Sequence, residues 1–216
     1  MMELYGYFRS SAAYRVRAAL NIKGLTYETV PVSLLAGDNR KAAYLEKNPQ
    51  GFVPCLTDGE VTMGQSLAML EYLEEKYPEP ALLPTDPAGR ARARQISGII
   101  ACDIHPLDNL RVLKYITGTL EVSQVQKTAW YHHWIISGFT AIEAILGDGR
   151  SGEFCHGDSV TFADLCLVPQ VYNARRFDCP LEDFPAITRI VENCNRLDAF
   201  IQAMPENQPD NKKAAT

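Results

Sequence analysis

The fold is decided by the stretch Phe8-Arg9-Ser10-Ser11-Ala12-Ala13-Tyr14-Arg15-Val16-Arg17, which follows a short apolar segment at residues 3–7. The apolar segment predicts a strand, and apolar side chains at helical spacing predict a helix over residues 11–23 that ends at Gly24. The two serines therefore lie where a helix begins, with arginines on both sides. Unpaired backbone N–H groups and the positive end of the helix dipole favour an anion at such a place.

Ser10 and Ser11 also allow a simpler interpretation, because serine is among the residues preferred at a helix N-cap. Taken alone, a strand followed by two serines and a helix is more typical of capping than of ligand binding. The neighbouring arginines and the rest of the chain favour binding.

The composition is that of a globular protein: 216 residues, 46% hydrophobic and 22% charged, enough to bury the core of one large domain or two ordinary ones. No apolar run approaches the length that a bilayer requires. A net charge of −5 argues against a nucleic-acid partner. The six cysteines show neither a C-x-x-C pair nor zinc-like spacing, so we expect no metal site and free thiols in a cytoplasmic protein.

The first part of the chain, up to Tyr77, alternates between strand and helix patterns, and Asp58-Gly59 signals a two-residue hairpin turn. After the first strand and helix, we expect a strand at 27–32, a helix near 40–47, strands at 53–57 and 60–63, and a helix at 66–77. The order β-α-β-α-β-β-α requires a parallel crossover followed by an antiparallel pair. A small three-layer α/β domain satisfies it.

Pro54 is awkward inside the strand expected at 53–57, because proline cannot donate a ladder hydrogen bond. A cis peptide bond between Val53 and Pro54 at the start of that strand would resolve the conflict. We therefore predict a cis bond there.

The segment 78–87 is rich in proline and is typical of a linker. Beyond it only helix patterns remain, at 88–118 with a kink at Pro106, then at 122–147, 162–177 and 184–200. Thr161 and Asp164 form a capping box at the start of one of these helices. We therefore expect three parts: an α/β domain at 1–82, an all-helical domain at 88–209 and a flexible tail at 210–216.

Several motifs in register resemble the glutathione transferases, with their thioredoxin-like first half and all-helical second half. They are the pattern F-R-S-S-x-x-x-R-V-R-x-A-L-x-x-K-G at 8–24, Val53-Pro54, Gln65-Ser66, and the runs 163–171 and 173–177. The pattern at 8–24 is similar to the zeta class, and within it to the bacterial maleylacetoacetate isomerases. The resemblance covers about residues 2–209.

One position departs from the zeta pattern, because Ala12 stands where the class has a cysteine. The loss removes a thiol but leaves the hydroxyls and the helix-end donors. It also argues against a thioredoxin-type oxidoreductase, which needs a cysteine of low pKa at this helix start.

The resemblance implies a glutathione-dependent, cytoplasmic homodimer that acts in the breakdown of tyrosine and phenylalanine. The implied reaction converts maleylacetoacetate to fumarylacetoacetate by reversible addition of a thiolate, with rotation about the bond that has become single. No protein cysteine lies where a helix end and cations could ionise it, so the thiolate would belong to bound glutathione.

By the same resemblance, Ser10 donates a hydrogen bond to that thiolate, and Ser11 assists or caps the helix. Substrates of the class are small dicarboxylates, and arginine suits carboxylate recognition. Arg9 and Arg176 are the candidates for this role. A surface salt bridge is the alternative for Arg176.

For glutathione itself, the resemblance implies that the backbone of Val53, aimed by a cis Pro54, pairs with the peptide like an added strand. Gln65 and Ser66 would hold the γ-glutamyl carboxylate at a helix start, although Ser66 could also be only an N-cap. Further along, His105 and Asn109 are four residues apart and share a helix face.

His105 could contact glutathione or stabilise an enolate, with a purely structural histidine as the alternative; Asn109 would contact glutathione. The other three histidines show no matching partner and are expected to be structural: His132, His133 and His156.

Three other functions compete with this hypothesis. Maleylpyruvate isomerase shares the arginine and histidine pattern, and a generalist glutathione transferase would use the same cofactor. A non-catalytic glutathione-transferase-like binding module belongs to a different class. Such modules commonly lose the activating hydroxyl, so the presence of Ser10, Gln65 and Ser66 favours an enzyme.

Overall fold

The computed structural model describes residues 1–211 and divides into two compact units. The first unit comprises Met1–Leu82 together with the described residues from Asn195 onward, and the second unit comprises Leu83–Cys194. The sequence-based division places residues 195–209 in the helical domain, whereas the structure groups them with the α/β unit. Among the described residues, no helix has the length and apolar character needed to cross a bilayer.

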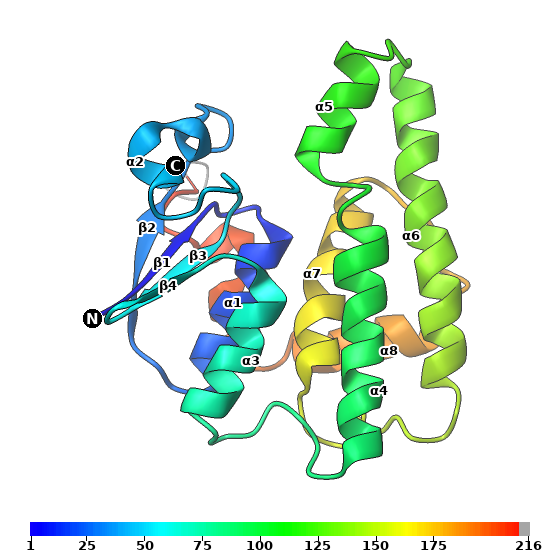
Figure 1. The fold of residues 1–216 in the computed structure, drawn as a ribbon. Helices are drawn as coiled ribbons and strands as arrows, with labels where there is room; N and C mark the ends of the chain where they lie inside the picture. Colours follow the sequence, from blue (N-terminus) through cyan, green and yellow to red (C-terminus); the bar gives the residue numbers. More distant parts are fainter. Residues whose placement is uncertain (212–216) are drawn as a thin grey trace. The chain divides into compact units, whose positions relative to one another are not determined.

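The first unit is built on a four-stranded sheet in the order β2-β1-β3-β4 (Figure 1). Strand β1 runs parallel to β2 and antiparallel to β3, and β4 is antiparallel to β3. This topology confirms the predicted parallel crossover followed by an antiparallel pair. The strands are β1 (Met2–Gly6), β2 (Tyr27–Pro31), β3 (Cys55–Asp58) and β4 (Val61–Met63).

Alternation of side chains along the strands gives the sheet two buried faces. Tyr5 of β1 lies opposite Cys55 of β3, and both pack with Tyr44 of the short helix α2 (Ala42–Leu45). The neighbouring pair Leu4 and Leu56 is also buried and points to the other face. Two 3₁₀ turns complete the unit: η1 (Asp38–Arg40) and η3 (Pro205–Asn207).

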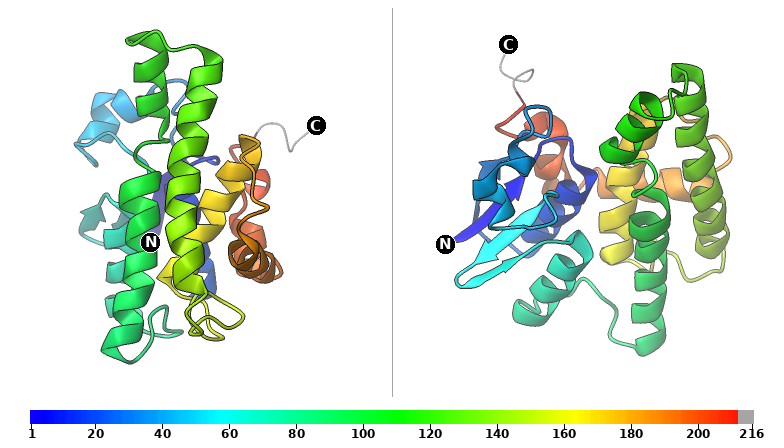
Figure 2. Two further views of the ribbon diagram at one scale, coloured as in Figure 1. Left: turned by 90° about the vertical axis from the view of Figure 1, so that its right-hand side faces the viewer. Right: turned by 45° about the horizontal axis from the view of Figure 1, so that its top comes forward.

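Helix α1 (Ser11–Ile22) is enclosed by its neighbours, since every residue from 11 to 20 is buried. It packs against α3 (Ser66–Lys76) and against the short helix α9 (Asp198–Ala203) (Figures 1 and 2). Backbone carbonyls of the C-terminal segment serve its polar side chains: Arg17 Nε donates to the Ala203 carbonyl (3.0 Å) and Asn21 Nδ2 to the Ala199 carbonyl (2.9 Å). These bonds explain why residues 195–209 belong to the first unit.

The predicted tail is anchored where it is described. The Asp210 carboxylate accepts from the Phe8 N–H (2.9 Å), and Asn211 Nδ2 donates to the Pro205 carbonyl (3.2 Å). The remainder of the tail, 212–216, lies outside the described residues.

Two local predictions around β3 have different outcomes. The Val53–Pro54 bond is cis, as predicted, and β3 begins only at Cys55, so the proline precedes the strand. The hairpin turn is displaced by one residue from Asp58-Gly59, because Asp58 pairs with Val61. Gly59 takes the left-handed conformation (φ 64°) that the two-residue turn requires.

The second unit is helical, and α4, α6 and α7 run alongside one another (Figure 2). The helix predicted at 184–200 is two helices, α8 in this unit and α9 in the first. The predicted kink at Pro106 is a complete break, in which α4 continues into the π-helix η2 and a new helix begins after it. The elements are α4 (Pro87–Gly98), η2 (Ile99–Ile104), α5 (Leu110–Gly118), α6 (Gln124–Leu146), α7 (Phe162–Arg176) and α8 (Pro185–Cys194).

The break has a physical cause in the sequence. Pro106 has no N–H to continue the helix and its ring crowds the preceding turn. The chain widens into a π turn, in which the His105 N–H donates to the Ile100 carbonyl (2.9 Å), and Trp130 Nε1 of α6 satisfies the Leu107 carbonyl (2.9 Å). Gly138 of α6 admits Ile104, whose side chain would overlap a Cβ at that position.

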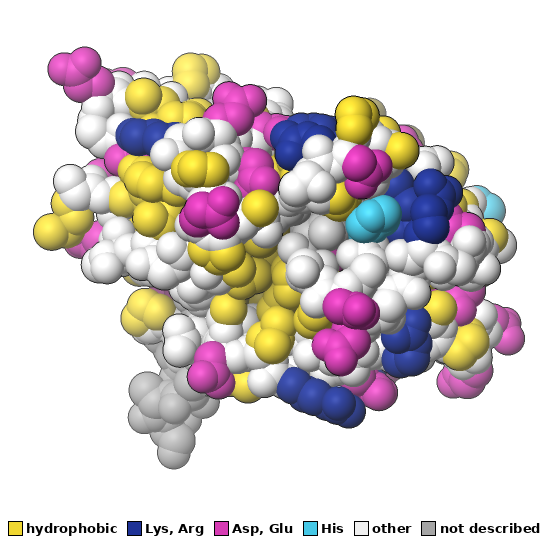
Figure 3. Space-filling model, turned by 90° about the horizontal axis from the view of Figure 1, so that it is seen from below, with side chains coloured by type: hydrophobic (Ala, Val, Ile, Leu, Met, Phe, Trp, Pro, Cys, Tyr) yellow, Lys and Arg dark blue, Asp and Glu magenta, His cyan; other side chains and the backbone are white. Residues whose placement is uncertain are grey.

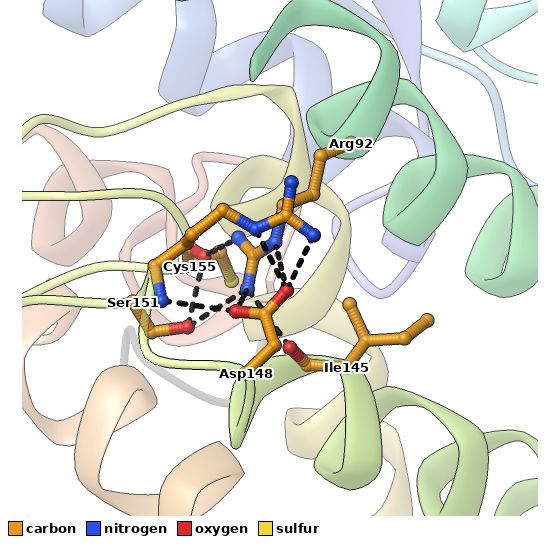
Figure 4. A network of polar contacts seen from close by, with 6 residues as sticks. Arg92, Ile145, Asp148, Ser151 and Cys155 are labelled. Atoms are coloured by element: carbon orange, nitrogen blue, oxygen red, sulfur yellow. Dashed lines mark hydrogen bonds and ion pairs between the residues drawn. The ribbon is translucent and has the colours of Figure 1, made fainter. Parts of the chain in front are cut away.

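A buried arginine organises the loop between α6 and α7 (Figure 4). The Arg92 side chain donates to the Asp148 carboxylate (3.0 and 3.1 Å), to the Ile145 carbonyl (3.0 Å), to Ser151 Oγ (3.0 Å) and to the Cys155 carbonyl. Burial raises the pKa of Asp148, but hydrogen bonds from the Arg150 N–H and from both guanidinium groups lower it to about 2. The predicted capping box of α7 is also confirmed.

Replacing this arginine should destabilise the protein. Because Arg92→Leu leaves several buried acceptors without a donor, we expect the free energy of unfolding to fall by about 3 kcal/mol. Urea unfolding of the full chain measures the change. The control is Arg175→Leu on the exposed end of α7, for which an equal loss would refute this assignment to Arg92.

Candidate functional site

Ser10 is the N-cap of α1. Its Oγ accepts from the Ala13 N–H (3.2 Å), and its own N–H donates to the Tyr7 carbonyl (2.9 Å). The capping interpretation is therefore correct, and it does not exclude binding. A hydroxyl whose oxygen accepts one bond keeps its hydrogen for another partner, so Ser10 can still donate to a ligand.

Ser11 is the first residue of α1 and is buried, as is Ala12, the position of the missing cysteine. The arginines that follow are buried as well, at 1% exposure for Arg15 and 2% for Arg17. Of the arginines around the two serines, only Arg9 is partly exposed. Its Nη2 donates to the Tyr7 hydroxyl (3.1 Å), and its guanidinium lies 4.9 Å from the centre of the Phe8 ring.

The backbone before β3 is oriented by hydrogen bonds to one carbonyl. The Phe52 carbonyl accepts from the Tyr44 hydroxyl (2.6 Å) and from Asn48 Nδ2 (2.8 Å). Because a trans peptide places its C=O and N–H on opposite sides, the Val53 N–H points away from both donors. Pro54, joined to Val53 by the cis bond, is buried.

The beginning of α3 departs from ordinary helix chemistry. Gln65 is the N-cap, yet its side chain makes no capping bond; its Nε2 donates to Gln50 Oε1 (2.7 Å) instead. Gln65 also adopts a positive φ of 66°, which is uncommon for a side chain other than glycine. Ser66 is the first helical residue, so its interpretation as the N-cap is wrong. The first N–H groups of α3 therefore lack a capping side chain, which suits an anion.

His105 and Asn109 lie in the second unit, within 3.5 Å of each other between His105 Nε2 and Asn109 Nδ2. They do not share a helix, contrary to the prediction, because His105 ends η2 and Asn109 is the N-cap of α5. Asn109 Oδ1 accepts from the Arg111 N–H (3.1 Å), so its amide nitrogen is the group that remains available to a ligand.

Arg176 is the last residue of α7 and is exposed. Its guanidinium lies 4.6 Å from the centre of the Phe177 ring, and Phe177 stacks on Tyr131 with 3.9 Å between ring centres. Within the part of the chain that the structure describes, no carboxylate forms an ion pair with it. The surface salt bridge considered for Arg176 is therefore not formed.

Sequence reasoning missed Asp108, which is 8% exposed and whose two carboxyl oxygens lack a hydrogen-bond partner among the described residues. Burial raises the pKa of Asp108 to about 8. Its charge in turn raises the pKa of Tyr131 and of Cys179, after burial, which is the larger cause for both. Asp108 lies between Leu107 and Asn109 just after a proline, and an Asp in such a turn is typical of a surface, so no local signal marks its burial.

Burial disfavours the thiolate form at four of the six cysteines. Only Cys102 is exposed, and burial raises the pKa of Cys55, Cys155, Cys179 and Cys194. Residues 1–211 contain no cluster of His, Cys, Asp and Glu that could hold a metal ion.

Two of the remaining histidines make contacts within the second unit. His132 Nε2 lies 2.7 Å from the Phe177 carbonyl, and His133 packs edge-on against Trp134. On the face drawn in Figure 3, basic side chains are interspersed with acidic ones.

The burial of Asp108 predicts a pH dependence of stability. An unfolded aspartic acid has a pKa of about 3.9, so between about pH 4 and pH 8 the folded form keeps a proton that the unfolded form has lost. Stability then falls as pH rises through this range. We expect Asp108→Asn to gain at least about 2 kcal/mol on the wild type between pH 4 and pH 8. Urea unfolding of both proteins across the range measures it.

The exposed Asp103 in η2 supplies the control, since Asp103→Asn should follow the wild type at every pH. A constant difference between Asp108→Asn and the wild type would contradict a protonated Asp108.

Known proteins share the sequence pattern and the fold of this chain. Residues 4–81 match the family described as the N-terminal domain of glutathione S-transferase. The chain is 48% identical over 209 residues to a probable maleylacetoacetate isomerase of Vibrio cholerae, covering 96% of this chain and 97% of that one.

Two solved structures share the whole fold. A holo maleylpyruvate isomerase, a bacterial zeta-class glutathione transferase, superposes with a TM-score of 0.94 at 44% identity and covers 96% of this chain and 99% of its own. The maleylacetoacetate isomerase of Methylobacterium extorquens AM1, with bound malonate and glutathione, gives 0.93 at 41% identity, with 96% and 98% covered. The chain belongs to the zeta class of the glutathione transferases.

Proposed function

We propose that this protein is a glutathione-dependent isomerase that converts maleylacetoacetate to fumarylacetoacetate. The proposal is supported by a near full-length relative of that name and by a similar structure that binds glutathione and a dicarboxylate. The observation that carries it in this chain is the beginning of α1, where a hydroxyl that can donate is present and a cysteine is absent. The enzyme must then take its thiol from a ligand.

The residues of the first unit fit glutathione. The tripeptide has a γ-glutamyl carboxylate, a peptide backbone and a thiol. The uncapped start of α3 suits the carboxylate, through Gln65 and Ser66. The Val53 N–H, turned away from its neighbours, suits the backbone, and the Ser10 hydroxyl suits the thiol. In this proposal His105 and Asn109 of the second unit supply further donors to the ligands.

Bound glutathione supplies a thiolate that can add reversibly beside a carbonyl and so allow a cis double bond to become trans. The protein must stabilise the ionised sulfur. The Ser10 O–H donates toward it, with Ser11 beside it at the positive end of α1, and both effects favour the thiolate over the thiol. The protein binds the two carboxylates of the substrate through Arg9 and Arg176, whose planar guanidinium groups match carboxylate geometry.

Glutathione dependence is the first test. Enzyme dialysed free of glutathione should be inactive in an absorbance assay with maleylacetoacetate, and activity should return in proportion to added glutathione until the site is saturated. Undiminished turnover without the tripeptide would rule out the proposed function.

The contribution of Ser10 can be measured in the same assay. We expect Ser10→Ala to lower kcat by about 100-fold, the scale seen when one stabilising donor is lost. The substitution also removes an N-cap, so the control is Ser123→Ala, which removes the N-cap of α6 at the same 3.2 Å hydrogen-bond length. Activity should survive in Ser123→Ala; a similar loss in both variants would assign the effect to capping.

Arg176→Ala should act on the substrate rather than on glutathione. Losing a charged hydrogen bond to a carboxylate should raise KM for the diacid by about tenfold or more. Glutathione affinity, measured by calorimetry, should change little. The neighbouring Arg175→Ala is the matched control, and a collapse of glutathione binding in Arg176→Ala alone would overturn the assignment.

Maleylpyruvate isomerase is the second candidate, favoured by the similarity to the holo structure of such an enzyme. The two reactions share the cofactor and the chemistry. The substrates differ in the group attached to the ketone on the side away from the cis double bond. Comparing kcat/KM for both acids with the same preparation decides between them.

A homodimer and a cytoplasmic location complete the proposal, and both derive from membership of the zeta class. We further propose that residues 1–82 bind glutathione and that the helical part expected at 88–209 contributes to the substrate site, although its residues 195–209 pack with the first unit.

A further inference from the structure

Arg15 lies on α1 with only 1% of its surface exposed, yet it has few partners. Its Nη1 donates to Ser66 Oγ (3.2 Å), while Nε and Nη2 have no hydrogen-bond partner among the described residues. A guanidinium group stays charged at every physiological pH and carries five N–H donors. Arg15 is therefore a buried positive charge whose one hydrogen bond within residues 1–211 is to a neutral hydroxyl.

The other buried cations of the first unit are compensated. Lys23 Nζ lies 2.9 Å from the Glu74 carboxylate and also donates to two carbonyls. Arg17 donates to two carbonyls and is attracted by the carboxylate of Asp210. Burying a charge without such partners is costly, so a protein that retains one gains something from it. Among these three buried cations, Arg15 is the one without a carboxylate or carbonyl partner among the described residues.

The contact with Ser66 shows where the charge of Arg15 acts. Ser66 is 7% exposed and is the first residue of α3, where no side chain caps the helix. Because its oxygen accepts from Arg15, its O–H is directed toward another acceptor. The start of α3 thus combines an oriented hydroxyl, unpaired N–H groups and a full positive charge behind them. That combination suits one carboxylate of a ligand.

We propose that Arg15 is a positioning residue that supplies the buried counter-charge for the γ-glutamyl α-carboxylate of glutathione, acting through the Ser66 hydroxyl. The inference rests on the proposed function, because it takes glutathione as the ligand. It adds a residue from the interior of α1 to the recognition of a group bound at α3. It also explains why the protein retains a buried charge at Arg15, where Nε and Nη2 have no hydrogen-bond partner among the described residues.

The test combines a variant of the protein with a variant of the ligand. Arg15→Met keeps the length and apolar stem of the side chain and removes the charge. Glutathione is compared with γ-aminobutyryl-cysteinyl-glycine, which lacks only the α-carboxylate. Calorimetry on the full chain should show Arg15→Met weakening glutathione binding by about tenfold or more, and binding of the analogue by less than about twofold. Arg15→Lys should recover part of the loss.

Stability of the ligand-free protein gives a second readout. Replacing an uncompensated buried charge with an apolar side chain should leave the unfolding midpoint of the free protein unchanged or higher. The upward shift of that midpoint on adding glutathione should be smaller in Arg15→Met. Arg40→Met, at an exposed arginine of the same unit, controls for the loss of one charge and should bind both ligands as the wild type does.

Failure of this inference can be told from failure of the proposed function. If the wild type does not bind glutathione, the proposed function is wrong. If it binds, but Arg15→Met weakens both ligands equally, weakens neither, or fails to fold, then Arg15 is a structural residue and only the inference is wrong.

Discussion

Helix α1 is covered on all sides, and this constraint shapes the first unit. A helix with no exposed face must provide a partner inside the protein for each polar side chain it carries. Arg17 and Asn21 find carbonyls in the C-terminal segment, and the Tyr14 hydroxyl lies 3.3 Å from the Phe200 carbonyl. The sheet, α3 and α9 are thereby tied to one element. Ser10 at the beginning of α1 and Arg15 in its interior are the exceptions, because both keep donors that a ligand can use.

The starts of α1 and α3 are built differently, and the sequence predicts the start of α1 better than the start of α3. A strand followed by Ser10 is enough to place a hydroxyl at the start of α1, because N-capping is a local preference. At α3 the sequence places Ser66 correctly but cannot show that Gln65 leaves the helix uncapped. Nor can it show that Arg15 lies beneath Ser66. Both depend on how α1 and α3 pack. The burial of Asp108 in the second unit is likewise a result of tertiary packing that the local sequence does not show.

The fold was predictable where the signals are local. The parallel crossover and the antiparallel pair follow from the succession of strands, helices and turns, and the cis bond follows from Pro54 beside a strand. The assignment of α9 could not be made, because a helical pattern does not show against which core the helix packs. The break after η2 was predicted only as a kink. Its full extent depends on Trp130 and Gly138, which lie more than twenty residues further along the chain.

The return of the chain from the second unit to the first has a consequence for biosynthesis. The acceptors for Arg17 and Asn21 lie at Ala203 and Ala199, beyond the helical unit in the sequence, so they leave the ribosome only after that unit has been made. The α/β unit therefore cannot complete its core until the contiguous helical unit has been synthesised in full. Until then a nascent chain must leave part of α1 uncovered, and a premature stop before α9 would deprive Arg17 and Asn21 of these acceptors.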